Sequence, residues 1–380
     1  MKIAYVTTYD ATDVRNWSGL GTYIAHTLQD NLTSLQYVSP LEEKAPFLLK
    51  AKRRFYTRLL KKSYLLERDP SVLKSYAKQV VNKLGSSNSD IIFSPGTIPI
   101  AYLDCHQPIV FWTDATFGGM IDFYPEFSNL CQESIKHGNQ MEKSALNRCK
   151  LAIYSSDWAA QTAIELYQIN PSKVRVVPFG ANLQSDRSLE DIKALIDLRP
   201  TTTCKLLFLS GNWQRKGGNI ALEVARELNR AGLRTELTIV GCTPSIGEFP
   251  PNCVKAIPFI DKNDIKGVEQ INQLIGESHF LILPSLADCT PVVFSEANSF
   301  GVPCLSTNVG GITTIIKDNV NGRTFSRNAA ISEYCDYITN LFSSYTQYKS
   351  LAISSFHEYQ NRLNWKVAGQ TVKNLLHELV

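Results

Sequence analysis

Short apolar segments alternate with polar, helix-length segments along the whole chain. Continuous apolar runs such as Phe280–Leu283 are typical of strands buried on both faces of a parallel sheet. The alternation therefore predicts α/β architecture with two doubly wound domains. The predicted strands are Ile3–Thr7, Asp90–Phe93, Pro108–Trp112, Leu151–Tyr154, Val174–Pro178, Lys205–Leu209, Glu236–Val240, Val254–Pro258, Phe280–Leu283 and Pro303–Ser306.

The length of 380 residues exceeds one typical domain and favours two. The most polar and least periodic segment is Ala181–Cys204, which is expected to hold a linker and a short helix. The predicted division is a first domain over 1–182, a linker over 183–203 and a second domain over 204–362. A last helix over 363–380 is expected to pack back on the first domain.

Composition excludes several classes of protein. A formal charge of +4, with 19% charged residues, does not suggest the clustered basic face of a nucleic-acid binder. The nine cysteines include no CxxC pair, which favours reduced thiols over a disulfide framework or a zinc site. No stretch approaches the roughly 20 apolar residues of a membrane span, and no signal peptide precedes the first strand, so a cytoplasmic location is expected.

The segment Pro284–Gly301, PSLADCTPVVFSEANSFG, places two carboxylates around a predicted helix start. Asp288 comes just before the helix and Glu296 lies in its second turn. Thr290 is the expected N-cap, and Pro291 suits the first helical position.

The N–H groups of Val292 and Val293 would then face the carboxyl end of a strand. Such N–H groups form a ready anion site, and the nearby acids would accept hydrogen bonds from hydroxyls. An anionic, hydroxyl-rich ligand such as a nucleotide-sugar would suit this segment.

A glycine-containing loop with two cations follows another predicted strand. Arg215 and Lys216 precede the pair Gly217 and Gly218, where they would neutralise a diphosphate. The loop is not a P-loop, because GxxxxGK[ST] is absent. The alternative is a solvated basic turn.

The first half carries two weaker candidates. Gly19 and Gly21 would let the backbone approach a substrate, but the third glycine of a dinucleotide fingerprint is missing, and tight turns are the alternative. Asp114 ends a strand, where it would orient a hydroxyl or act as a base. An N-cap or turn aspartate is the alternative.

Residues Lys50–Lys62 carry seven basic residues and no acid. Leu48, Phe55 and Leu59 fall on roughly one helical face. This pattern predicts a basic amphipathic helix that contacts anionic lipid or a polyprenyl-phosphate acceptor through 48–62. The alternative is a solvated face whose apolar stripe packs inward.

Taken together, the motifs resemble the retaining glycosyltransferases of the GT-B fold, family 4 (glycosyl transferases group 1). The motifs are WSGLGTYI, FWTDATF, YSSDWAA, VVPFGAN, SGNWQRKGG, Asp288-x7-Glu296, FGVPCLST, NVGGI and DNVNG. They cover most of the chain. The resemblance implies two Rossmann-like domains that face a central cleft, with the acceptor bound by the first domain, 1–182, and the nucleotide-sugar by the second, 204–362.

The resemblance also implies an enzyme, a hexosyltransferase. It would move a hexose from a UDP- or GDP-sugar to the hydroxyl of a saccharide or lipid-linked acceptor, with retention and without a metal or other cofactor. Two alternatives stay open: a GT-B nucleotide-sugar epimerase, and a non-catalytic nucleotide-sugar-binding protein.

The resemblance assigns roles to residues. Glu296 would bind the ribose, Asp288 would face the donor sugar, and Arg215 and Lys216 would hold the diphosphate. The expected catalytic set is Asp114, Arg215, Lys216 and Asp288. The expected donor-binding set is Gly19, Gly21, Gly211, Arg215, Lys216, Gly241, Phe259, Thr290, Pro291, Val292, Val293 and Glu296.

Three positions depart from the family pattern. Asp288 replaces the usual Glu, Pro291 replaces a glycine, and Asp114 stands near the place of a histidine.

Overall fold

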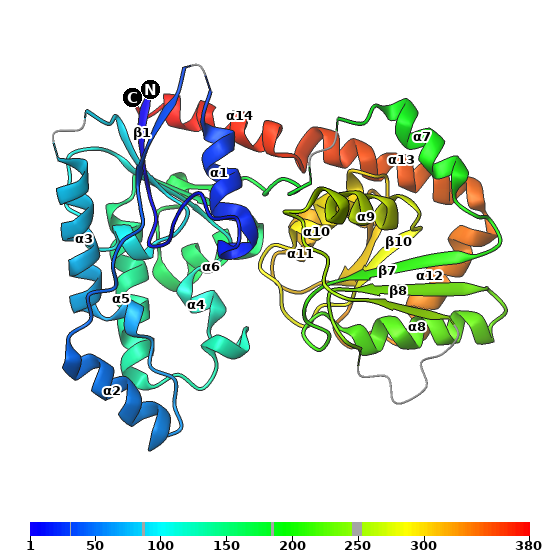
Figure 1. The fold of residues 1–380 in the computed structure, drawn as a ribbon, viewed down its shortest axis with the longest axis horizontal. Helices are drawn as coiled ribbons and strands as arrows, with labels where there is room; N and C mark the ends of the chain where they lie inside the picture. The colour runs from blue at the N-terminus through cyan, green and yellow to red at the C-terminus, as the bar shows by residue number, and fades with distance from the viewer. Residues whose placement is uncertain (31, 86–87, 184–185, 245–252) are drawn as a thin grey trace. The chain divides into compact units, whose positions relative to one another are not determined.

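The computed structural model describes residues 1–380 except 31, 86–87, 184–185 and 245–252. The chain forms two compact units (Figure 1). Unit 1 comprises Met1–Pro178 and Ala368–Val380, and unit 2 comprises Phe179–Val367.

Unit 1 is built on a six-stranded parallel sheet in the order β2-β1-β3-β4-β5-β6. Every residue of β3, β4 and β5 is buried, as expected for central strands of a doubly wound sheet. The strands are β1 Lys2–Val6, β2 Ser34–Val38, β3 Ile91–Ser94, β4 Ile109–Thr113, β5 Leu151–Tyr154 and β6 Val174–Val176.

Helices flank this sheet, and local sequence explains several of their starts. Asp69 accepts a hydrogen bond from the Ser71 N–H and caps α3, whose first residue is Pro70. Ser156 caps α6 in the same way. The helices are α1 Leu20–Leu28, α2 Phe47–Arg58, α3 Pro70–Leu84, α4 Phe117–Met120, α5 Gln132–Arg148 and α6 Asp157–Tyr167. Single 3-10 turns cover Asn16–Gly19, Leu66–Arg68, Ile98–Ile100, Pro125–Phe127 and Pro171–Lys173.

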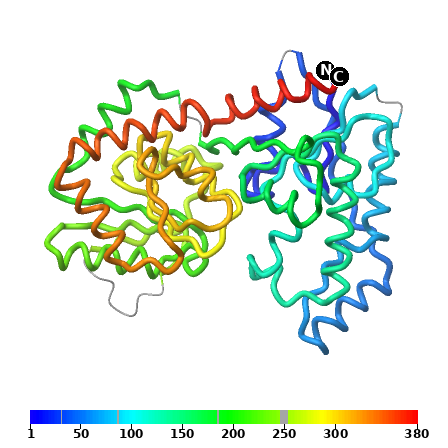
Figure 2. Tube along the Cα trace, turned by 180° about the vertical axis from the view of Figure 1, so that it is seen from behind, coloured from blue at the N-terminus to red at the C-terminus, as the bar shows by residue number. Residues whose placement is uncertain are grey.

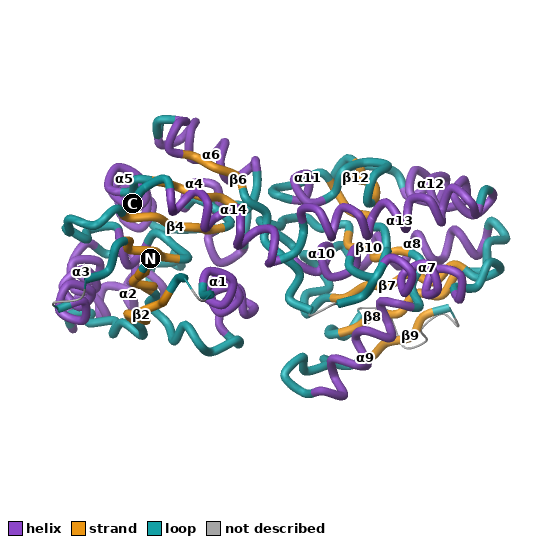
Figure 3. The backbone as a smooth tube through the Cα atoms, turned by 90° about the horizontal axis from the view of Figure 1, so that it is seen from above, coloured by secondary structure: helices purple, strands orange, loops and turns teal. Residues whose placement is uncertain are grey.

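Unit 2 repeats this architecture with a second six-stranded parallel sheet, in the order β12-β11-β10-β7-β8-β9. Figure 3 shows the strands of each unit among their helices. The strands are β7 Cys204–Leu209, β8 Thr235–Val240, β9 Val254–Ile257, β10 Phe280–Leu283, β11 Cys304–Thr307 and β12 Gly322–Phe325. The helices are α7 Leu189–Leu198, α8 Gly218–Arg230, α9 Ile265–Gly276, α10 Val292–Asn298, α11 Ile312–Ile315, α12 Ile331–Ser343 and α13 Tyr345–Arg362. The prediction of two Rossmann-like domains is confirmed.

The segment 183–203, expected to hold a linker and a short helix, contains α7, as predicted. Ile192 and Ile196 of this helix are at most 2% exposed and belong to the core of unit 2. Ser188 caps α7 through a capping box with Asp191. The helix α7 therefore packs in unit 2, because its apolar stripe enters the core of that unit. The linker bounds stay a prediction.

The last helix, α14 (Trp365–His377), returns the chain to unit 1, beside α1 (Figure 2). Lys373 Nζ donates to Asp30 Oδ2 at 2.7 Å. A Cβ at Gly369 would lie 2.1 Å from the Thr27 hydroxyl oxygen, so only glycine permits this close approach.

Candidate functional site

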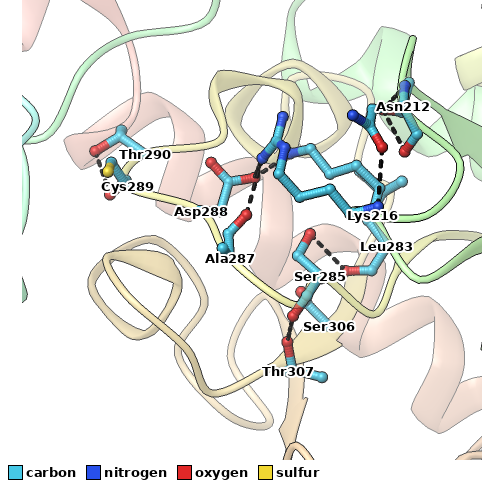
Figure 4. A network of polar contacts seen from close by, with 12 residues as sticks. Asn212, Lys216, Leu283, Ser285, Ala287, Asp288, Cys289, Thr290, Ser306 and Thr307 are labelled. Carbon is cyan, nitrogen blue, oxygen red and sulfur yellow. Dashed lines mark hydrogen bonds and ion pairs between the residues drawn. The ribbon is translucent and has the colours of Figure 1, made fainter. Parts of the chain in front are cut away.

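The predicted diphosphate loop joins β7 to α8 in unit 2. Lys216 Nζ forms an ion pair with Asp288 Oδ2, toward which it points in Figure 4. Arg215 Nη1 lies 3.8 Å from the same oxygen and donates to the Ala287 carbonyl at 2.8 Å. Asp288 is only 5% exposed and Lys216 only 8%. The structure thus brings together three of the four predicted catalytic residues, as a cluster in which Lys216 and Asp288 are buried and Arg215 is partly exposed.

Glycine shapes this loop where a side chain has no room. Gly217 has φ +73°, and a Cβ there would lie 2.0 Å from the Pro284 carbonyl oxygen. A Cβ on Gly218 would lie 2.2 Å from the Trp213 ring. The Leu286 N–H donates to the Arg215 carbonyl at 2.8 Å, which fixes the two loops of the cluster to each other.

Hydroxyl groups hold the second loop, between β10 and α10, at the carboxyl end of the sheet. Ser306 Oγ donates to the Leu283 carbonyl at 2.5 Å, and Thr307 Oγ1 donates to the Ser285 carbonyl (Figure 4). The Gly311 N–H donates to the Asp288 carbonyl at 3.0 Å. The backbone of the acid is therefore positioned before any ligand arrives.

The start of α10 differs from the expected one. Pro291, not Thr290, is the N-cap, and it makes no side-chain capping bond. Thr290 Oγ1 donates to the Cys289 carbonyl at 2.6 Å. The helix begins at Val292, so the first N–H groups, on Val292 and Val293, have neither an intrahelical acceptor nor a side-chain cap.

Glu296, expected to bind ribose, already has a partner. It is 1% exposed, and its two carboxylate oxygens accept from Lys262 Nζ at 2.8 and 2.7 Å. The Lys262 side chain is 36% exposed and comes from the segment between β9 and α9. Sequence reasoning missed Lys262, because nothing in its neighbourhood distinguishes it from other surface lysines.

Gly211 and Gly241 lie close together at the carboxyl ends of β7 and β8. A Cβ on Gly211 would have the Gly241 carbonyl oxygen, at 3.9 Å, as its nearest neighbour. Gly241 has φ +93°, and its Cβ would lie 3.1 Å from the Ser210 carbonyl oxygen. Phe259, also predicted to bind the donor, follows β9 and is 76% exposed. The donor-binding roles of these three residues stay predictions.

In unit 1, packing accounts for one of the predicted glycines. A Cβ on Gly21 would lie 2.4 Å from the Tyr9 hydroxyl, and Tyr5 Oη donates to the Gly21 carbonyl at 2.6 Å. Gly19 has φ +80°, directly after Trp17 and Ser18 at +46° and +54°. The loop therefore takes a backbone conformation that needs glycine, whatever its part in ligand binding.

Asp114 follows β4 and lines a cavity of about 290 Å³ within unit 1. Burial, and to a lesser degree the Asp114 charge, raises the pKa of Tyr9 in the same cavity. Two further lining residues, Arg68 and Glu142, were not predicted. Asp114 belongs to unit 1 and the other predicted catalytic residues belong to unit 2, so its catalytic role stays a prediction.

A search of the described residues finds no group of three or more His, Cys, Asp or Glu side chains arranged to hold a metal ion. Within the same residues, no helix is long and apolar enough to cross a membrane.

Comparisons with known proteins bear on the fold and on the class of protein. Residues 203–344 match the family model of glycosyl transferases group 1. A D-inositol 3-phosphate glycosyltransferase of Acidothermus cellulolyticus is 26% identical over 184 residues, which cover 45% of this chain and 41% of that protein. The chain thus spans about two fifths of the length of the curated relatives it matches.

Solved structures match over nearly the whole chain. A sucrose-phosphate synthase from Thermosynechococcus elongatus has a TM-score of 0.68 at 14% identity, with 100% of this chain and 99% of that chain covered. Anabaena HepE in complex with UDP has a TM-score of 0.66 at 17% identity, with 100% of both chains covered. The chain therefore has the GT-B fold of glycosyltransferases, and its residues 203–344 carry a domain of glycosyl transferases group 1.

Proposed function

We propose that the protein is a glycosyltransferase that moves a hexose from a UDP- or GDP-sugar to the hydroxyl of a saccharide or lipid-linked acceptor. The observation that carries the proposal is the cluster that Arg215 forms with the buried pair Lys216 and Asp288, at the carboxyl ends of the strands. Two cations in a site with little water stabilise a developing anion more strongly than they would in bulk water. The departing nucleoside diphosphate is such an anion.

Asp288 has two parts in this proposal. Without a ligand it neutralises Lys216, which would otherwise be a buried, unpaired charge. When the diphosphate binds, its oxygens replace the Asp288 carboxylate as the partner of Arg215 and Lys216. The Asp288 carboxylate then becomes available to a hydroxyl of the donor sugar. Because Asp288 is one methylene shorter than a glutamate, the sugar must approach its backbone more closely.

Glu296 and the start of α10 would hold the other parts of the donor. The ribose hydroxyls would bind the Glu296 carboxylate in competition with Lys262. The N–H groups of Val292 and Val293 would donate to a phosphate or a sugar hydroxyl. The UDP that names the HepE structure supports a uridine nucleotide as the first donor to test.

Retention without a metal is the proposed mode of transfer. Arg215 and Lys216 supply the positive charge at the diphosphate. The acceptor hydroxyl attacks the face that the diphosphate leaves, and the leaving phosphate takes its proton. Water must be excluded during transfer, or hydrolysis competes.

The same proposal places the protein at an anionic membrane surface through α2. The helix buries no residue, and Phe47, Leu48, Phe55 and Leu59 are between 50% and 78% exposed. Its inner side instead carries Leu49 and Tyr56, which pack on Tyr64 and Leu66. An apolar stripe beside the five cations of α2, followed by Lys61 and Lys62, is the composition of a helix that lies in a lipid interface.

Donor turnover tests the proposal. UDP-, GDP- and ADP-sugars are incubated with the purified protein, with and without EDTA, and released nucleotide and free sugar are measured. Lys216→Met and Glu296→Gln should each lower turnover about 100-fold or more, because an electrostatic contact to the transition state is lost. The controls Lys266→Met and Glu269→Gln repeat the same changes at exposed positions of α9.

Each alternative has its own signature. A nucleotide-sugar epimerase would release a sugar with altered stereochemistry in the absence of an acceptor. A binding protein would bind UDP without turnover. Full activity in both site variants would refute the site, and strict metal dependence would refute the metal-free mechanism.

A further inference from the structure

A second cavity, of about 380 Å³, lies within unit 2 at the amino end of its sheet. Leu195 and Leu198 of α7 line it, together with Lys205 near the start of β7 and Asn272 of α9. Its volume is within the usual range of ligand pockets, about 300–1,000 Å³. The proposed diphosphate site is at the carboxyl ends of the same strands, so this cavity is at the opposite end of the sheet and has no part in the proposed transfer.

Two arginines contact the same wall residue of this cavity, Phe300. The Arg187 Cζ lies 3.8 Å from the centre of the Phe300 ring, and Arg199 Nη2 donates to the Phe300 carbonyl at 2.8 Å. Both arginines line the cavity. Burial lowers the pKa of Arg187, and the charges of Tyr359 and Asp191 oppose this effect only in part. An anion in the cavity would therefore stabilise the charged form of Arg187.

Arg199 is a buried cation that forms no ion pair among the described residues. It is 3% exposed. Its Nε donates to the Gly276 carbonyl at 3.1 Å, and its Nη1 donates to the Gly301 carbonyl at 2.9 Å and to Tyr348 Oη at 2.7 Å. With the bond to Phe300, these contacts leave the second Nη2 N–H without an acceptor among the described residues. The carbonyl groups supply dipoles to Arg199 but no negative charge.

The charge balance of the cavity favours an anionic ligand. Lys205 pairs with Glu277 at 3.1 Å, and Glu277 is the one acid among the described lining residues. Arg187 and Arg199 are therefore not balanced by any acid of the described lining. Guanidinium groups bind carboxylates and phosphates through charge-assisted hydrogen bonds. Because most Arg199 N–H groups already have acceptors, a carboxylate with two oxygens fits this site better than a phosphate with three.

The other walls describe the rest of the ligand. Leu195, Leu198 and Phe300 are apolar and suit an aromatic or branched aliphatic body. Asn272 Oδ1 is buried and has no hydrogen-bond partner among the described residues. A buried acceptor of this kind costs folding free energy, so a ligand hydroxyl that donates to it recovers that cost.

We infer that this cavity binds a small organic carboxylate with an apolar body and one hydroxyl group, the carboxylate at Arg187 and Arg199 and the hydroxyl at Asn272. The inference goes beyond the transferase proposal and does not depend on it. The ligand binds at the amino end of the sheet, so it and a nucleotide occupy unit 2 at the same time.

Calorimetry and saturation-transfer NMR on the full chain test the inference. The probe 4-hydroxybenzoate carries the carboxylate, the ring and the hydroxyl. Benzoate lacks the hydroxyl, 4-hydroxybenzamide lacks the charge, and 4-hydroxyphenyl phosphate has a phosphate in place of the carboxylate. We expect 4-hydroxybenzoate to bind about 10-fold more tightly than 4-hydroxybenzamide, and more tightly than the other two probes. Saturating UDP should not displace it.

Two variants test the contacts one at a time. Arg187→Met should weaken the binding of 4-hydroxybenzoate about 10-fold, because a charge-assisted hydrogen bond is lost. Lys193→Met also removes a cation, at an exposed position of α7, and should have no effect. Asn272→Leu should remove the preference for 4-hydroxybenzoate over benzoate and leave benzoate binding unchanged, because only the hydroxyl loses its acceptor.

An exposed position covers the case in which Arg187→Met fails to fold. Leu198 lines the cavity and is 81% exposed, so Leu198→Glu adds a negative charge there without a change in the core. It should weaken the binding of 4-hydroxybenzoate at least about 10-fold. The control Leu166→Glu, at an exposed position of α6, should not. Equal or tighter binding of the amide or the phosphate, displacement by UDP, no binding of any probe, or unchanged binding in Leu198→Glu would each overturn the inference.

Discussion

Lys262 donates to both carboxylate oxygens of Glu296, at 2.8 and 2.7 Å. The lysine thus occupies the two oxygens that are expected to bind the ribose hydroxyls. Glu296 is almost fully buried, whereas Lys262 reaches it from a partly exposed position. The lysine therefore balances a carboxylate that would otherwise be buried and unpaired. In the proposed function a nucleotide ribose would replace Lys262 at Glu296, because the lysine is the partly exposed member of the pair.

Lys262→Met should lower the free energy of unfolding by about 1–2 kcal/mol. Loss of one partner from a fully buried pair costs about 3–5 kcal/mol, and the exposure of Lys262 reduces this figure. Urea unfolding measures the change. Adding Glu296→Gln should restore part of the loss, because no unpaired charge remains. An additive double variant would show that the two residues do not interact.

Asp288→Asn should separate donor binding from transfer. The variant removes the charge that competes with the diphosphate for Lys216, so UDP should raise the melting temperature more than it does in the wild type. The ligand-free variant should itself melt lower, because Lys216 is left as a buried cation. Transfer should fall about 100-fold if the carboxylate contacts the sugar. A smaller UDP-induced shift than in the wild type would contradict this role of Asp288.

Gly217→Ala should disrupt the diphosphate loop. The new Cβ would lie 2.0 Å from the Pro284 carbonyl oxygen, in a backbone conformation at φ +73°. We expect a loss of about 2 kcal/mol or more in stability and a parallel loss of UDP affinity. For stability, Gly211→Ala is the matched control, because its Cβ has no neighbour closer than 3.9 Å. Equal stability of the two variants would argue against the close approach.

Central strands were predictable from sequence, and so were the edge strands β6 and β9, but the edge strands β2 and β12 were not. Leu151–Tyr154 and Phe280–Leu283 form strands over the predicted residues, because burial on both faces leaves a continuous apolar run. The strands β2 and β12 were missed, and both lie at sheet edges. Four of the five residues of β2 are at least partly exposed, so its sequence carries no such run.

The part of the site that follows paired strands was predictable from sequence. Arg215, Lys216 and Asp288 follow strands that pair in the sheet, so their loops meet at one edge. The partner of Glu296 lies 34 residues away, in a segment without a periodic pattern. Glu142 looks like any polar residue of an amphipathic helix, and only the fold brings it to a cavity.

The membrane proposal for α2 predicts binding to anionic vesicles. The protein should float with phosphatidylglycerol vesicles and not with phosphatidylcholine vesicles, and added salt should weaken flotation. Replacing Phe55 and Leu59 by Glu should abolish it, because the apolar stripe is lost. Val81→Glu is a control at an exposed apolar position of α3. Flotation that survives the change in α2 would assign lipid contact to another surface.

Glu142 should give the stability of the protein a distinct pH dependence. Burial raises its pKa from 4.5 to about 7, although the Thr97 hydroxyl, the Arg68 charge and the Phe117 N–H oppose the rise. The neighbouring groups Cys149, Tyr154 and Tyr167 also have raised pKa values and stay neutral near pH 7, which leaves Arg68 as the charged neighbour.

Because the folded protein holds this proton more tightly, the stabilisation is complete below pH 4.5 and is lost as the pH rises to about 7. The shift of 7 minus 4.5 corresponds to about 3 kcal/mol. Urea unfolding at a series of pH values should therefore show a steeper decline in the wild type than in Glu142→Gln, with Glu126→Gln as the control. Equal slopes in the wild type and Glu142→Gln would mean that the carboxyl group is ionised at an ordinary pH.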